Sequence, residues 1–150
     1  MSISLRLADP ADLPRLLALA QAFHAEDGHA LDARGEAAMA ALLADTDKGR
    51  LWLIVAAGEP VGYAALCFGF SIEYGGRDAF IDDIYVVPEA RGKGIGSRIL
   101  DLVCAAARDC GCLALHLEVM EDNAGAARLY ERHGFRDRSS RLMSLRMEQA

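Results

Sequence analysis

A strand, a glycine-rich loop and a helix follow one another in the middle of the chain, and this junction constrains the fold more than any other stretch. Residues 80–87 are mostly β-branched or aromatic, as expected for a buried strand. Pro88 ends that strand, because proline has no N–H to give to a ladder. Apolar residues then recur at helical spacing after the loop, at Ile99, Leu102, Val103 and Ala106. The sequence therefore predicts a strand that turns through glycines directly into a helix.

The loop of this junction combines alternating glycines with cations, which are Arg91, Gly92, Lys93, Gly94, Gly96 and Arg98. The first turn of a helix has N–H groups without partners and a positive dipole end, so anions bind there, phosphates above all. Glycine lets a phosphate approach the backbone closely. The alternative is a tight strand–helix turn, in which the glycines are needed only for the backbone geometry of the turn. The spacing G-x-G-x-G fits neither the P-loop pattern nor the dinucleotide fingerprint G-x-G-x-x-G.

Length and composition indicate one ordinary domain over residues 1–150. The chain is 53% hydrophobic and 25% charged, which is typical of a globular protein with a core rather than a disordered one. Its net charge of −6 argues against nucleic acid as a partner, which would require a basic field. No stretch of the sequence is long and apolar enough to suggest a bilayer span, so we expect no membrane partner and a cytoplasmic location.

The four cysteines do not indicate a metal site or a disulfide framework. None of them forms a C-x-x-C pair, and reduced, largely buried thiols are the expected state. Cys110, Cys112 and His116 lack a second cluster that would complete four ligands. His24 and His29 lie in a polar stretch that reads as a solvated loop, and two histidines there are weak evidence for a metal. We therefore expect no metal.

Periodicity and turn residues give the order of the remaining elements. An alternating strand at 3–7 is followed by a helix that Asp9 and Pro10 begin and that ends near Gly28. The Asp82-Asp83 pair interrupts the alternation of its strand, which suggests a bulge or an exposed edge. The further elements expected from the pattern are a helix at 34–44, strands at 51–57, 61–70 and 79–87, a helix at 94–108, a strand at 113–119, a helix from Asn123 to Gly134, and closing strands at 135–137 and 141–147. This order predicts an α+β fold with a mixed, mostly antiparallel central sheet flanked by helices on both faces.

A second motif lies in the C-terminal half, between Asn123 and Phe135. It reads N-x-x-A-x-x-L-Y-x-x-x-G-F. Asn123 and Tyr130 are seven residues apart, about two helical turns, so they share a helix face with Ala126. A small residue on that face would allow a ligand to lie close, although a core tyrosine on an amphipathic helix is the alternative.

These two motifs, in this order, resemble the signatures of the GCN5-related N-acetyltransferases (GNAT). The string from Arg91 to Gly96 is similar to their R/Q-x-x-G-x-G/A loop, and residues 123–135 are similar to their second signature at each fixed position. The specific match covers about 78–137, whereas the N-terminal part agrees only in element order. The resemblance implies the acyl-CoA N-acyltransferase (GNAT) fold and acetyl-coenzyme A as cosubstrate.

The resemblance also implies which residues would bind the coenzyme. The loop amides would hold its pyrophosphate, strand backbone near Ile84 and Val86 would pair with the peptide-like arm, and Asn123 would bond an arm amide. Tyr130 would lie beside the sulfur and protonate the leaving thiolate. The whole expected set is Ile84, Tyr85, Val86, Arg91, Gly92, Lys93, Gly94, Ile95, Gly96, Ser97, Asn123, Ala126 and Tyr130.

The base that takes the amine proton is open between three carboxylates. Asp82 and Asp83 lie where similar diamine acetyltransferases have a Glu-Asp pair, and adjacent like charges raise one pKa, which suits a base. Glu118 is the rival, because acetyltransferases that modify a protein N-terminus have a glutamate at the similar position. Together with Glu26 and Glu73, Asp82 is expected to contact the substrate.

Three functions remain open from the sequence. The first is acetylation of a primary amine of a small molecule, which the acidic candidates favour. The second is acetylation of a protein or peptide N-terminus or lysine. The third is a non-catalytic protein that senses acetyl-coenzyme A, which the intact Asn123 and Tyr130 argue against. A homodimer is common among such proteins and is left open.

Overall fold

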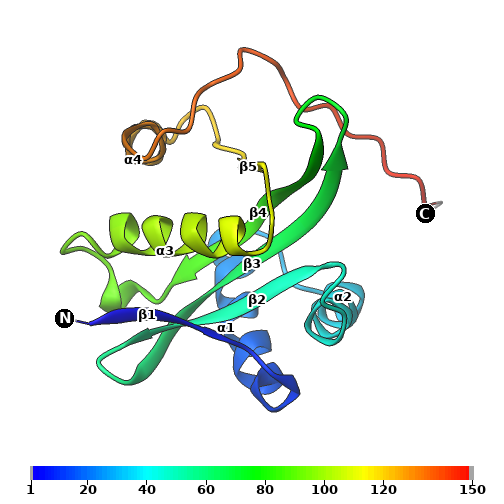
Figure 1. Ribbon diagram of the computed structural model, residues 1–150. Coiled ribbons are helices and arrows are strands. Elements are labelled where there is room, and N and C mark those ends of the chain that lie inside the picture. The colour runs from blue at the N-terminus through cyan, green and yellow to red at the C-terminus, as the bar shows by residue number, and fades with distance from the viewer. Residues whose placement is uncertain (1, 149–150) are drawn as a thin grey trace.

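A five-stranded sheet in the order β1-β2-β3-β4-β5 forms the centre of the molecule (Figure 1). The computed structural model describes residues 2–148. Its strands are β1 (Ile3–Leu7), β2 (Gly49–Ala56), β3 (Glu59–Ser71), β4 (Gly76–Val86) and β5 (Ala114–His116). The first three pairings are antiparallel and the last, β4 with β5, is parallel. The predicted mixed, mostly antiparallel sheet is thereby confirmed.

The helices begin at residues whose side chains satisfy free backbone N–H groups. Asp9 accepts a bond from the N–H of Ala11 before a short 3-10 turn, and Asp32 accepts one from Gly35. The helical elements are η1 (Pro10–Asp12), α1 (Leu13–Glu26), α2 (Ala33–Ala44), η2 (Pro88–Ala90), α3 (Ile95–Asp109) and α4 (Ala124–Arg132). Among residues 2–148, no helix has both the length and the apolar character that crossing a bilayer requires.

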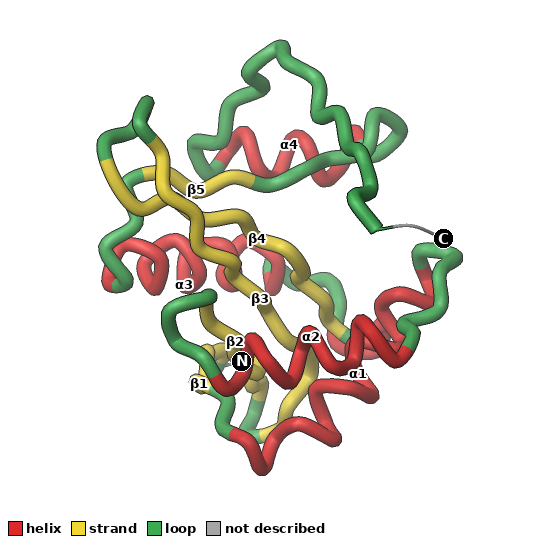
Figure 2. The backbone as a smooth tube through the Cα atoms, turned by 90° about the vertical axis from the view of Figure 1, so that its right-hand side faces the viewer, coloured by secondary structure: helices red, strands yellow, loops and turns green. Residues whose placement is uncertain are grey.

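Strand alternation divides the core between the two faces of the sheet. On one face α1 and α2 pack on odd-numbered residues of β2 and β3, namely Leu51, Leu53, Tyr63 and Ala65. On the other face α3 packs on the even-numbered Trp52, Ile54, Ala64 and Leu66. Helices therefore cover both faces, as predicted, and α4 lies beyond β5 (Figures 1 and 2).

A bulge lies in β4 at the predicted aspartate pair. Asp83 is opposite Ala65 and Ile81 is opposite Leu66, so Asp82 is the extra residue between them. Ile81 and Ile84 pack toward α3, whereas Asp83 and Tyr63 meet on the face covered by α1.

The closing strands predicted at 135–137 and 141–147 are wrong, because no ladder forms in that segment. The strand predicted at 113–119 is also shorter and covers Ala114–His116 alone. After α4 the chain runs extended, past the β3–β4 turn and toward the start of α2 (Figures 1 and 2). An alternating sequence becomes a strand only where an edge is available to pair with it, and residues 135–148 have no such partner within the described chain.

Candidate active site

The parallel strands β4 and β5 separate after a short pairing. Asp78, Ala79 and Phe80 of β4 pair with β5, and the pairing ends at His116. β4 continues to Val86 with β3 on one side, while the chain after His116 leaves toward α4. This divergence opens a gap between the two strands, at the end of β4 that leads into the glycine loop (Figure 1).

Three successive residues of the glycine loop have a left-handed backbone. The φ angles are 96° at Gly92, 59° at Lys93 and 77° at Gly94, and Gly94 is the N-cap of α3. All three are exposed, and a Cβ added at Gly92 or Gly94 would meet nothing within 4 Å. The loop therefore presents bare backbone at the positive end of α3, which fits a phosphate.

Arg91 joins the glycine loop to α1 and β4. Its Nε donates to the carbonyl of Val86 at 2.8 Å, and its guanidinium binds both carboxylate oxygens of Glu26 at 2.9 and 2.7 Å. The same guanidinium lies 5.5 Å from the centre of the Tyr85 ring. Glu26, expected to contact the substrate, is thus placed at the glycine loop, where it balances the charge of Arg91. Lys93, also on this loop, has no ion pair among residues 2–148.

Gly96 and Ser97 connect α3 to α4. A Cβ at Gly96 would lie 3.3 Å from Cδ2 of Leu129, so the missing side chain allows α4 to approach. Oγ of Ser97 is 2.8 Å from Nε2 of His133, whose Nδ1 lies 3.1 Å from Asp101. These contacts place α4, the helix that carries Tyr130, beside the start of α3.

The aspartate pair of the bulge lies against a tyrosine and a histidine. The buried Tyr63 hydroxyl donates to Asp83 at 2.7 Å, and Nε2 of His24 is 3.5 Å from the same oxygen. Desolvation, and then the charge of Asp83, raise the pKa of Asp82. The carboxylate of Asp82 is therefore more basic than that of an ordinary aspartate, which suits a group that accepts a proton from an amine.

A groove of about 1130 Å³ lies between β5, α4 and residues 135–142. Glu118 and Tyr130 both line it, and burial raises the pKa of Tyr130, so this hydroxyl stays protonated at neutral pH. Asn123 begins α4, where its Oδ1 accepts the N–H of Ala126 at 3.1 Å. Glu73, expected to contact the substrate, pairs with Arg138 at 2.9 Å on the far side of the groove.

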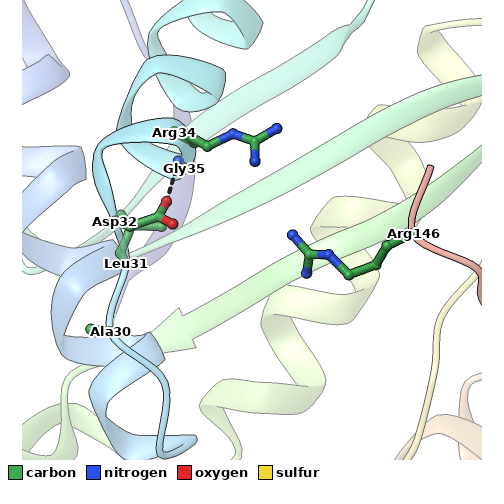
Figure 3. Close-up of a pocket in the computed structure, with 6 residues that line it drawn as sticks. All are labelled: Ala30, Leu31, Asp32, Arg34, Gly35 and Arg146. Atoms are coloured by element: carbon green, nitrogen blue, oxygen red, sulfur yellow. Dashed lines mark hydrogen bonds between the residues drawn. The ribbon is translucent and has the colours of Figure 1, made fainter. Parts of the chain in front are cut away.

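A smaller pocket of about 410 Å³ lies at the start of α2 (Figure 3). The side chains of Arg34 and Arg146 extend into it from opposite sides, and Glu148 pairs with both arginines. Its other lining residues are Ala30, Leu31, Asp32 and Gly35, and Asp32 is occupied as the helix cap. The charged side chains at this pocket are therefore already paired with one another, and its lining residues do not form a catalytic site.

Three of the four thiols are poor nucleophiles because they are partly buried. Burial raises the pKa of Cys67 to about 11 and also raises the pKa values of Cys104 and Cys112, so these thiols stay protonated. Across residues 2–148, no three His, Cys, Asp or Glu side chains gather as a metal site would require.

Sequence reasoning did not identify Tyr63 or the contact that His24 makes. Tyr63 is 20 residues from Asp83, and the two approach only through the β3–β4 register, which places Tyr63 opposite Tyr85. His133 was also missed, because its partners lie on another helix. The signal available in the sequence is a polar residue on the inward face of a strand or helix. That signal does not identify which residue it contacts.

Comparison with known proteins identifies the same family that the two sequence motifs resemble. The sequence profile of the acetyltransferase (GNAT) family matches residues 16–135. Thialysine N-epsilon-acetyltransferase of Bos taurus is 42% identical over 90 residues, which cover 57% of this chain and 52% of that protein. The mouse protein of the same name is 38% identical, with 59% and 52% covered. The chain spans about half the length of the curated relatives it matches.

Solved structures share the whole fold. An integron cassette protein from the mobile metagenome of Cole Harbour Salt Marsh is 38% identical, with a TM-score of 0.84, and the match covers 98% of this chain and 92% of that one. A possible acetyltransferase from Clostridium difficile 630 has a TM-score of 0.85 at 22% identity, with 99% and 100% covered, which is a likeness of fold alone.

Proposed function

Because the chain belongs to the acetyltransferase (GNAT) family, we propose that it transfers an acetyl group from acetyl-coenzyme A to the primary amine of a small molecule. The observation that carries this proposal is the separation of β4 from β5 directly before a bare glycine loop. Asp82 and Asp83 lie on β4 beyond its pairing with β5, and Tyr130, whose raised pKa keeps its hydroxyl protonated at neutral pH, lies on α4. Acyl transfer to an amine needs a base that takes the amine proton and an acid that protonates the leaving thiolate.

The residues around the gap fit the coenzyme. The exposed backbone of Gly92, Lys93 and Gly94 and the first-turn amides of α3 would take the pyrophosphate. Edge backbone of β4 at Ile84 would pair with the arm, and Asn123 and Ala126 would lie along it. Bound acetyl-coenzyme A would supply the acetyl group as a thioester.

Side chains of this protein would then carry out two proton transfers. Asp82 or Asp83, directly or through a water, would take a proton from the substrate ammonium and so generate the neutral amine that attacks the thioester, and Glu118 is the alternative base. Backbone N–H groups at the end of β4 would stabilise the oxyanion. Tyr130 would donate its proton to the departing thiolate, for which a hydroxyl that stays protonated at neutral pH is suited.

The charges at the site favour a cationic acceptor. Glu26 and Glu73 are each balanced by an arginine, whereas Asp82 forms no ion pair within residues 2–148. The name thialysine N-epsilon-acetyltransferase of the mammalian relatives indicates a small-molecule amine. We therefore place thialysine, lysine and short alkyl diamines first among the acceptors.

Release of the coenzyme thiol, measured with a panel of amines, tests this function. We expect turnover with cationic small amines and loss of turnover in Tyr130→Phe. Turnover only with peptide N-termini or peptide lysines would favour the second function. Tight acetyl-coenzyme A binding without turnover on either panel would favour a sensor.

A further inference from the structure

The last turn of α1 contacts two different parts of the candidate site. Nε2 of His24 lies 3.5 Å from the carboxylate of Asp83 on β4. Glu26, further along the same turn, binds Arg91 at the glycine loop. This turn therefore connects the carboxylates proposed for the acceptor with the loop proposed for the coenzyme, so a change of partner at one of them can affect the other.

Arg91 holds Glu26 through a single nitrogen atom. Nε of Arg91 donates to the carbonyl of Val86 at 2.8 Å, and Nη2 donates to both carboxylate oxygens of Glu26, at 2.9 and 2.7 Å. Within residues 2–148, Nη1 makes no hydrogen bond or ion pair. The two side chains are 46% and 44% exposed, and exposed ion pairs typically change an equilibrium constant by about fivefold or less. The bond to Val86 can therefore remain while the guanidinium changes its acidic partner.

The coenzyme would compete with Glu26 for this guanidinium. Arg91 directly precedes Gly92, Lys93 and Gly94, whose exposed backbone is proposed to take the pyrophosphate. A pyrophosphate carries more negative charge than one carboxylate, and arginine binds phosphate oxygens with two parallel N–H donors. Exchange of Glu26 for the pyrophosphate therefore replaces a weak, exposed ion pair with a stronger one.

An aromatic cluster links Glu26 to the aspartate pair. Desolvation, and then the charge of Glu26, raise the pKa of Tyr85, so this carboxylate lies near the Tyr85 hydroxyl. Tyr85 is opposite Tyr63 in the β3–β4 ladder, and the Tyr63 hydroxyl binds Asp83 at 2.7 Å. Phe23 of α1 contacts the rings of both tyrosines, at 6.4 and 5.5 Å between centroids. Without Arg91, Glu26 would therefore add an unbalanced negative charge to the acceptor side of the site.

We propose that Arg91 neutralises Glu26 until the coenzyme binds, and that Glu26, released when the pyrophosphate takes Arg91, then binds an ammonium group of the acceptor. The inference rests on the proposed function, which supplies the two ligands. Each ligand then strengthens the binding of the other by the same factor, because coupling in binding free energy is reciprocal. Acceptors with a second ammonium group benefit most, since Asp82 and Asp83 serve the amine that reacts.

Calorimetry with coenzyme A and diaminobutane tests this coupling without turnover, because coenzyme A carries no acetyl group. In the wild type, diaminobutane should bind about two- to fivefold more tightly when coenzyme A is present, since the coupling is limited by the strength of the exchanged ion pair. In Glu26→Gln, coenzyme A should bind about two- to fivefold more tightly than in the wild type, because Arg91 is already free. Diaminobutane should then gain nothing from coenzyme A. Unchanged coenzyme A affinity in Glu26→Gln, or coupling that persists there, would overturn the proposal.

Glu89→Gln is the matched control for the loss of one negative charge. Glu89 lies on η2 without an ion pair among residues 2–148, and its charge also acts on the Tyr85 hydroxyl. This variant should keep the coupling and gain less coenzyme A affinity than Glu26→Gln. An equal gain in both variants would show a general electrostatic effect and overturn the exchange. Because Glu26 and Glu89 are exposed, the circular dichroism of both variants should match wild type.

Arg91→Gln distinguishes the release of Glu26 from its loss. This variant leaves Glu26 free at all times, so the protein without coenzyme should bind diaminobutane about as tightly as the wild type does with coenzyme A. Glu26→Gln should instead bind it weakly in both states. Lys93→Gln is the matched control, because Lys93 is a cation of the same loop without an ion pair among residues 2–148. Weak binding of diaminobutane by Arg91→Gln, or an equal gain in Lys93→Gln, would overturn the proposal.

The wild-type measurements separate this inference from the proposed function. A wild-type protein that binds no coenzyme A would contradict the proposed function and this inference together. A wild-type protein that acetylates amines, but binds diaminobutane equally with and without coenzyme A, would overturn this inference alone.

Discussion

The hydroxyl of Tyr63 donates a hydrogen bond to the carboxylate of Asp83 at 2.7 Å, from a side chain with no exposed surface. Burial and the charge of Asp83 raise the pKa of Tyr63, so the tyrosine remains the donor at all working pH values. His24 approaches the same oxygen at 3.5 Å from α1. The exposed Asp82 is thus next to a carboxylate that side chains of two other elements contact.

Tyr63→Phe should lower kcat if Asp83 is the base. The change keeps the ring but removes the donor that holds the carboxylate of Asp83 in place for the proton transfer. Tyr74→Phe is the matched control, because that hydroxyl binds Arg138 instead of Asp83. A Tyr63→Phe enzyme with wild-type kcat, measured where chemistry is rate-limiting, would count against Asp83 as the base.

Asp83→Asn distinguishes the two aspartates by its effect on the acidic limb of the kcat/KM profile. The charge of Asp83 contributes to the raised pKa of Asp82, so its removal should lower that pKa. If Asp82 is the base, the acidic limb moves to lower pH in Asp83→Asn and is lost in Asp82→Asn. If Asp83 is the base, Asp83→Asn removes the limb itself. A change of the limb in Glu118→Gln alone would assign the base to the groove instead.

The sequence predicted most of what depends on local chemistry. Pro88, the glycines at 92 and 94 and the apolar spacing of α3 fix the strand–loop–helix junction within one short stretch. The bulge was also predictable, because two adjacent aspartates cannot both follow the alternation of β4. These features need no knowledge of distant residues.

Features that depend on distant partners were not predictable. Arg91 and Glu26 are 65 residues apart, as are Arg138 and Glu73, and spacing along the chain does not reveal either ion pair. The alternation of 141–147 correctly indicates strand-forming residues but says nothing about which edge they meet. In the described chain they meet none, and the predicted strand is an exposed arm.

Gly94→Ala should weaken acetyl-coenzyme A binding more than it weakens the fold. With φ at 77°, an alanine there costs roughly 1–2 kcal/mol of strain and places a methyl group on the surface meant for phosphate. Gly58→Ala is the matched control, since Gly58 has φ of 81° at the remote β2–β3 turn and equally open surroundings. Calorimetry should show reduced affinity in Gly94→Ala alone, with similar losses of thermal stability in both. Equal affinities would count against phosphate binding at this loop.

Tyr130→Phe should lower kcat by about 10²–10⁴-fold, the usual contribution of a general acid, while affinity for acetyl-coenzyme A changes little. The ring and its edge contact with Phe135, at 6.0 Å between centroids, remain. Because burial raises the pKa of Tyr130, the wild-type hydroxyl should stay a donor well above neutral pH. Tyr74→Phe is the matched control, since Tyr74 lines the same groove but binds Arg138. A Tyr130→Phe enzyme with wild-type single-turnover rates would make Tyr130 a packing residue of α4.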